Sequence, residues 1–308
     1  MLSHSPSKKT VINLPPEIER EIFEFAARSS PGTAVKLAGL CKQTQYWMEW
    51  LIYETVALDH PATRTAAFIR TLEAKPKEFF SQRIKNLYLS YSITVEDAHK
   101  VLAVCSELTH LTCWAQGSSG QTEGMLSAYL NPAASTSSSS LTRLSIKLDM
   151  LTAPNSLPSF SNPIFQTLTH LEIVSPPSVN TGVSIDWNAL IALPRLKHLI
   201  IGILSSWDHF YLLPVIQGLL NRSETLEVLG IVSKDMEMLE ALGCEEFDDA
   251  RLVIFPRFNW PLDLPTYWRK VYTGEFDVWE PTAHKARKQR LERGRVSLTC
   301  LSSCARSR

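Results

Sequence analysis

The six residues Leu168-Thr169-His170-Leu171-Glu172-Ile173 decide the fold, because their pattern returns 28 residues later as Leu196-Lys197-His198-Leu199-Ile200-Ile201. The shared form is Leu-x-x-Leu-x-Ile, and its last two apolar positions alternate as they do in a β-strand. The same form, with Ile, Leu or Cys at its apolar positions, begins at Ile84, Leu108, Leu141 and Leu226. The six starts are 24, 33, 27, 28 and 30 residues apart, and a weaker seventh strand is expected over 251–255.

Helix signals fill the segments between these strands. Thr94 is followed three residues later by Asp97, which is typical of a helix cap, and apolar residues continue at helical spacing to Cys105. Helices are also expected over 211–220 and, behind a cap at Ser233, over 236–242. Strands that alternate with helices in this way predict an α/β fold with a parallel sheet.

This strand–helix period resembles a leucine-rich repeat array, a solenoid in which each repeat packs on its neighbours. Such repeats usually have about 20 to 29 residues, so an irregular solenoid is expected over 83–255. An open parallel α/β sheet that is not a solenoid is the alternative. In leucine-rich repeats the x residues of the strands line the concave face, which implies substrate binding there. The candidate substrate-binding residues are Tyr88, His110, Thr112, Trp114, Arg143, Lys147, His170, Glu172 and His198.

The remaining segments beyond residue 80 have biased compositions. Residues 115–140 are rich in Ser, Gly, Thr and Ala, and residues 153–163 carry three prolines among serines and asparagines. Both are expected to be long surface loops, which act as spacers, binding loops or phosphorylation sites. The aromatic segment 256–282 is expected to cap the open end of the array. The basic tail 283–308 is expected to be disordered, with a nuclear address or a nucleic-acid contact as the alternatives.

A second apolar region precedes the repeats. Pro15 and Pro16 stand at the start of a helical pattern with Ile18 and Ile22 on one face, and Gly32 lies beyond its end. Two more short helices fit residues 33–42 and 43–53. Three short helices cannot bury this many apolar side chains, so a partner or the next domain is expected to cover them.

The N-terminal region resembles an F-box, of the F-box-like kind that is numerous in mushroom-type fungi. The resemblance lies in Leu14-Pro15-Pro16-Glu17-Ile18, in Leu37-x-x-Leu40-Cys41-Lys42 and in the aromatic run 46–56. The family often has a tryptophan three residues after the cysteine; Thr44 stands there, and Trp47 is expected to replace it. An ordinary helical hairpin that caps the next domain is the alternative.

The F-box resemblance implies docking on the Skp-type linker and cullin scaffold of a ubiquitin ligase. The residues that it assigns to linker binding are Leu14, Pro15, Glu17, Ile18, Ile22, Phe23, Leu37, Leu40, Cys41 and Trp47.

Composition excludes several classes of protein. The formal net charge is 0, so neither nucleic acid nor an anionic membrane is an expected partner. The hydrophobic content of 44% is that of a globular chain. The first residues lack the apolar core of a signal peptide, and the six cysteines form no Cys-x-x-Cys pair. The cysteines are therefore expected to be thiols, in a protein of the cytoplasm or nucleus.

Motifs for catalysis are missing from the sequence. It contains no Gly-x-Ser-x-Gly elbow, no phosphate-binding glycine loop and no His-Glu-x-x-His. His110, His170 and His198 share one repeat position, and neighbouring strands lie ~4.8 Å apart, so a pair of imidazoles would meet. No carboxylate or thiolate pattern completes a metal site there. We therefore expect no enzyme, no catalytic residue, no cofactor and no bound metal.

Together these patterns predict six segments and one function. The segments are a disordered N-terminus (1–11), an F-box-like helical domain (12–57), a linker helix (58–82), a repeat domain (83–255), an aromatic cap (256–282) and a basic disordered tail (283–308). The expected function is substrate recognition for an SCF-type ubiquitin ligase. A non-ligase interaction scaffold with a degenerate F-box is the alternative.

Overall fold

The computed structural model divides the chain into two compact units, Met1–Glu54 and Thr55–Arg308. The structure describes residues 14–30, 32–59, 61–115, 141–147, 150, 160, 163–174, 185–202, 209–233, 247, 249–256, 279–280 and 282–291. The helical unit was expected to end at residue 57, but the structure ends it at Glu54.

The first unit contains three helices, α1 (Pro16–Ser29), α2 (Thr33–Ala38) and α3 (Lys42–Glu54). Proline fits the first turn of α1, where the backbone N–H has no partner within the helix, and two glutamates favour that positive end. Gly32 precedes α2 with a φ of 79°, a left-handed conformation that glycine adopts freely. The helix expected over 33–42 ends early, since Gly39 is a poor helix former.

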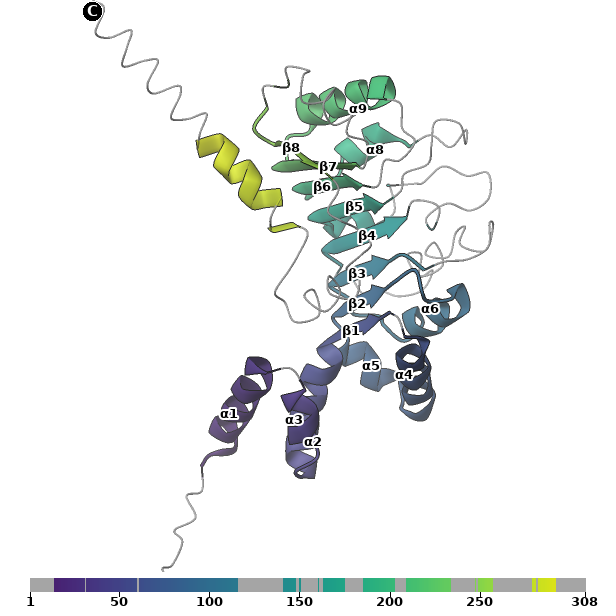
Figure 1. Cartoon of the computed structure of the whole chain (residues 1–308), viewed down its shortest axis with the longest axis vertical. Helices are drawn as coiled ribbons and strands as arrows, with labels where there is room; N and C mark the ends of the chain where they lie inside the picture. Colours follow the sequence, from purple (N-terminus) through teal and green to yellow (C-terminus); the bar gives the residue numbers. More distant parts are fainter. Residues whose placement is uncertain are drawn as a thin grey trace, which may run out of the picture. The chain divides into compact units, whose positions relative to one another are not determined.

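The second unit holds a parallel sheet, so the predicted α/β fold is confirmed. Among the described residues it has eight strands, and each strand pairs with the next along the chain (Figure 1). The strands are β1 (Thr55–Leu58), β2 (Asn86–Leu89), β3 (His110–Cys113), β4 (Arg143–Lys147), β5 (His170–Val174), β6 (His198–Gly202), β7 (Val228–Ser233) and β8 (Leu252–Pro256).

The sequence pattern located seven of these strands and missed β1. Val56 pairs with Leu87 and Leu58 pairs with Leu89, so Tyr53-x-x-Val56-x-Leu58 is a divergent copy of the repeat. The Leu-x-x-Leu-x-Ile pattern does not identify this copy, because its first position is an aromatic residue at the end of α3. Residues 55–57 therefore belong to the sheet and not to the helical unit.

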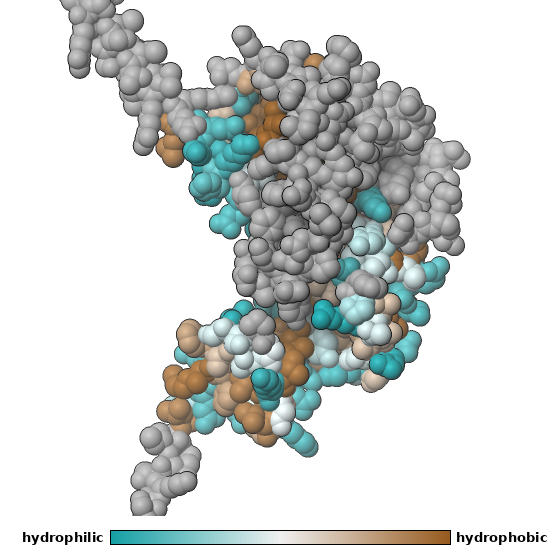
Figure 2. All heavy atoms as spheres, viewed as in Figure 1, coloured by the Kyte–Doolittle hydropathy of each residue, from teal (hydrophilic) through white to brown (hydrophobic). Residues whose placement is uncertain are grey.

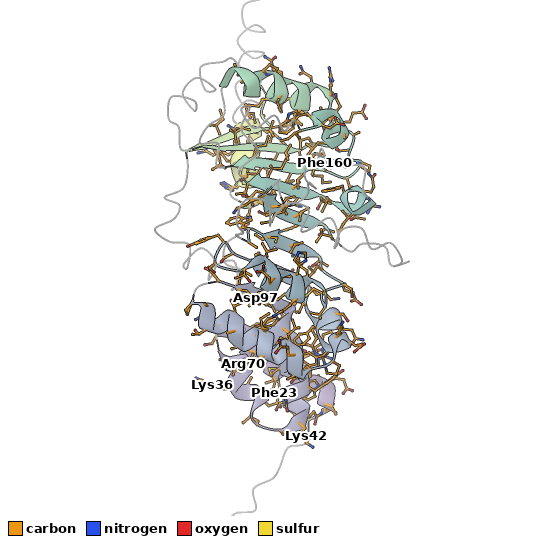
Figure 3. The ribbon with its side chains drawn as sticks, turned by 90° about the vertical axis from the view of Figure 1, so that its right-hand side faces the viewer. Phe23, Lys36, Lys42, Arg70, Asp97 and Phe160 are labelled. Carbon is orange, nitrogen blue, oxygen red and sulfur yellow. The ribbon has the colours of Figure 1, made fainter. Side chains whose placement is uncertain are left out.

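Helices connect most of the strands. They are α4 (Ala62–Ala74), α5 (Lys77–Arg83), α6 (Val95–Leu102), the 3-10 helix η2 (Pro163–Thr167), α8 (Trp187–Ile191) and α9 (His209–Arg222). The expectation of one linker helix over 58–82 was wrong, because Pro76 separates α4 from α5. The predicted cap of α6 is confirmed, since the Thr94 hydroxyl accepts from the Asp97 N–H at 3.2 Å (Figure 3).

The leucine positions of the strands form the main core. Leu87, Leu111 and Leu171 are buried. Phe160 (Figure 3) is buried as well and packs edge-to-face against Phe165. In β5 and β6 four consecutive residues are buried. Successive side chains of a strand point to opposite faces, so both faces of the sheet are covered there.

The chain has a C-terminal helix over residues 282–291. The tail was expected to be disordered from residue 283, but Ala, Lys, Arg and Gln favour helix and the segment is helical to Leu291. The expected cap at 256–282 lies mostly outside the described residues. So do the two expected loops and the expected helix over 236–242. Within the described chain, every helix is too short or too polar to cross a membrane.

Candidate functional site

The first candidate site is an exposed apolar row on α1. Ile18, Ile22 and Phe25 follow one another at spacings of four and three residues, so they share one face of the helix. Their exposed fractions are 42%, 51% and 76%. Leu14, just before the helix, and Val35, Leu40 and Tyr46 are exposed as well. Figure 2 shows the resulting hydrophobic surface over the three-helix unit, in the lower part of the view.

The opposite side of α1 holds the small unit together. Phe23 packs against Trp47 with ring centroids 6.2 Å apart, and Trp47 and Met48 are buried. Arg28 forms an ion pair with Glu54 at 3.5 Å. Trp47 is thus a core residue of this unit, whereas the linker-binding prediction had assigned it to the docking surface.

Thr44 has a specific task at the start of α3. Its hydroxyl accepts from the Cys41 N–H at 3.1 Å and donates to the Cys41 carbonyl at 3.0 Å. The contact resembles the returning half of a capping box, in which the third helical residue bonds to the cap. The same hydroxyl lowers the pKa of the exposed Cys41 thiol below its usual value. A threonine at this position therefore completes the turn before the aromatic helix.

The other predicted linker-binding residues divide by exposure. Those that are exposed are Leu14, Pro15, Glu17, Ile18, Ile22, Leu40 and Cys41. Phe23 and Leu37 are half-buried. Two of the exposed members, Ile18 and Ile22, belong to the apolar row, and the role of all of them in binding remains a prediction.

The second candidate site is the x face of the sheet, meaning the face to which the x residues of the repeat point. The register aligns them in two columns. The first column is Asn86, His110, Arg143, His170, His198 and Val228. The second column is Tyr88, Thr112, Ser145, Glu172, Ile200, Gly230 and Val253. Both columns are polar over the first strands; the second becomes apolar or small from β6 to β8, and the first becomes apolar at β7.

Part of the x face is buried. The Trp114 indole N–H donates to the Ser145 hydroxyl at 2.9 Å, which donates to a Glu172 carboxylate oxygen at 2.6 Å. Trp114 is 3% exposed and Glu172 is 8% exposed, and Thr112 is buried as well. These three predicted substrate-binding residues are therefore buried, and two of them, Trp114 and Glu172, are joined through Ser145. Tyr88, His110, Arg143, Lys147, His170 and His198 are half-buried.

The predicted meeting of imidazoles is confirmed. The rings of His170 and His198 have centroids 4.3 Å apart, and Trp279 packs edge-on against His170. Burial, with His198 and Arg143 nearby, lowers the pKa of His170 to about 3. Burial and Arg143 lower the pKa of His110 to about 4. These two rings are therefore neutral at physiological pH, and the described residues contain no group of three metal-ligating side chains.

The C-terminal helix covers the apolar end of the x face (Figure 1, yellow). Trp279 packs with Ile200 and Val232, while Ala283 and Ala286 pack with Val228 and Val253. The sequence interpretation missed this contact. One signal was present, because a glycine within a strand, such as Gly230, often marks a close approach of another segment. Comparison with protein-family models, curated proteins and solved structures gives no match for this chain.

Proposed function

We propose that this protein is a substrate-recognition adaptor, which docks on a Skp-type linker of an SCF-type ubiquitin ligase through its F-box-like three-helix unit. The observation that carries the proposal is the exposed row of Ile18, Ile22 and Phe25. A soluble unit of three short helices has no structural need for these side chains at its surface. Contiguous exposed apolar surface of this kind marks interaction sites.

The second unit is the substrate-binding part in this proposal. We interpret its sheet as an irregular leucine-rich repeat domain, since consecutive strands pair in parallel at each recurrence of one sequence form. A rigid sheet positions a bound protein reproducibly. The mechanism is proximity, because holding a target lysine near the conjugating enzyme raises its effective concentration.

A non-ligase scaffold is the second candidate. One observation favours it: Trp47, which was expected to stand in for the tryptophan of the family, lies in the core against Phe23. In this alternative, the three-helix unit has kept its fold and binds a different protein through the same exposed row.

Binding to a purified, immobilised Skp-type linker tests the proposal. We expect the full-length chain to bind and the double substitution Leu14→Ala with Ile18→Ala to weaken binding at least ~10-fold, as truncation of central interface residues does. The folded state of each variant is checked by circular dichroism. Because both side chains are exposed, the substitutions should leave the fold intact.

The matched control is Tyr91→Ala with Leu291→Ala. It also removes two exposed apolar side chains, but both lie outside the three-helix unit. We expect it to bind like the wild type. A folded wild-type protein that does not bind the linker overturns the adaptor proposal and leaves the scaffold.

A further inference from the structure

The C-terminal helix runs alongside strand β7 and antiparallel to it. Trp279 contacts Val232 near the end of the strand, and Ala286 contacts Val228 at its beginning. Arg290 donates to the carbonyl of Glu227, one residue earlier. These contacts reach from one end of β7 to the other.

Small residues of the sheet make room for this helix. A Cβ atom at Gly230 would lie 3.1 Å from the Thr282 methyl group and 3.1 Å from Ile200 Cγ1. Thr282 is 2% exposed, so the first turn of the helix fits closely over the glycine. The x residues of β7 are thus Val228, Gly230 and Val232, and the helix lies closely over them.

Both apolar and basic side chains of the helix contact the x face of the sheet. One aromatic anchor, Trp279, lies at its start, and two alanines lie beneath its middle. Lys285 donates to the Ile254 carbonyl at 2.7 Å, and Arg290 to that of Glu227. Both acceptors are backbone atoms, so they would accept equally well from basic side chains of another helix.

We propose that the x face of β6–β8 is a helix-binding site, which Trp279 and residues 282–291 fill in cis. Its partner in trans is an amphipathic helix with the same chemistry: an aromatic anchor, small residues on the contact face and basic residues in its last turns. That this helix belongs to the ubiquitination substrate rests on the proposed function. The cis helix acts as a tethered competitor that the substrate displaces.

The test uses the full-length chain and a fluorescein-labelled peptide with the sequence of residues 277–293, read by fluorescence anisotropy. Ala286→Glu places a carboxylate against Val228 and Val253 and should release the cis helix. A short tether holds a competitor at about millimolar effective concentration. We therefore expect the variant to bind the peptide at least ~10-fold more tightly than the wild type. The control is His284→Glu, with the same charge on the exposed side, which should bind like the wild type.

A substitution at Gly230 is the second part of the test. Gly230→Ala, added to Ala286→Glu, should weaken peptide binding at least ~10-fold, because its methyl group meets the position of Thr282. Gly218→Ala is the matched control, since a Cβ there has no neighbour within 4 Å. The proposal is overturned if Ala286→Glu does not gain affinity, or if Gly230→Ala and Gly218→Ala behave alike.

Hydrogen exchange of the wild type keeps the proposal testable if Ala286→Glu does not fold. A displaceable helix opens without unfolding of the sheet, so the exchange rates of the amides of 282–291 should not depend on low urea concentrations. The amides of β7 should exchange only through global unfolding, so their exchange rates should rise with urea. Equal urea dependence of both sets would make the helix an integral part of the fold and overturn the proposal. None of these measurements involves the linker, so they succeed or fail separately from the adaptor experiment.

Discussion

At the residue scale, Thr44 links the sequence of the first unit to its stability. Its hydroxyl satisfies both the N–H and the carbonyl of Cys41, and the residue itself is buried. The F-box resemblance predicts a tryptophan at this position, but the structure has a helix cap there. The cap fixes the first turn of the helix whose next turn carries Trp47.

Replacement of Thr44 measures this role. We expect Thr44→Val, which keeps the shape but loses the hydroxyl, to lower the free energy of unfolding by about 1 kcal/mol. Thr44→Ser keeps the hydroxyl and should retain most of the stability. Urea titration followed by circular dichroism checks both. Equal losses for Val and Ser would show that packing, and not the hydrogen bonds, makes this residue important.

At the element scale, Arg251 joins the start of β8 to the end of α9. Its guanidinium binds the Asp249 carboxylate, with contacts of 2.6 to 3.1 Å, which raises the pKa of Arg251. It also donates to the carbonyls of Leu220, Ser223 and Leu226. The last carbonyls of a helix have no partner within it, so a cation there both completes hydrogen bonds and opposes the helix dipole.

Only a planar, forked side chain makes all of these contacts at once. We therefore expect Arg251→Lys to lower the free energy of unfolding by about 1–2 kcal/mol, although the charge is unchanged. Arg222→Lys, at an exposed site with a single bond to Asn188, should change it by less than about 0.5 kcal/mol. Urea unfolding curves give both values. Similar curves for the two variants would contradict the role of the fork.

Across the whole molecule, the x face concentrates basic groups, and two of them, His110 and His170, are held neutral. The first column carries His110, Arg143, His170 and His198 on neighbouring strands. With folded pKa values of about 4 for His110 and about 3 for His170, the unfolded chain takes up these protons first as the pH falls. Stability is then fully present above the unfolded pKa of about 6.5 and is lost as the pH falls towards 4 and 3.

This linkage predicts a lower melting temperature at pH 4.5 than at pH 7.5. His170→Phe keeps an aromatic ring beside His198 and Trp279 but cannot titrate. Its melting temperature should therefore fall less between the two pH values. Thermal unfolding followed by circular dichroism at both pH values measures the difference. An identical fall in the variant would assign the pH dependence to other groups.

The repeat pattern predicted part of this fold and missed another part. The repeat form located seven strands and the meeting of His170 and His198, because register follows from one short pattern. The form failed at β1, where Tyr53 and Val56 replace the expected leucines and an aromatic helix runs up to the strand. Exposure of the x residues was harder to predict. The pattern that points Glu172 and Trp114 away from the leucine core carries no information about what else covers them.

The order of seven strands, their parallel pairing and the apolar row of α1 could be predicted, since they depend on the spacing of residues close together in the chain. The folded chain was needed to show that Trp47 lies in the core, that Thr112 and Glu172 are buried, and that a C-terminal helix lies along β7. These are contacts between distant parts of the chain. Their stability comes from the fit of one surface to another, such as Thr282 over Gly230, and that fit leaves no periodic trace in the sequence.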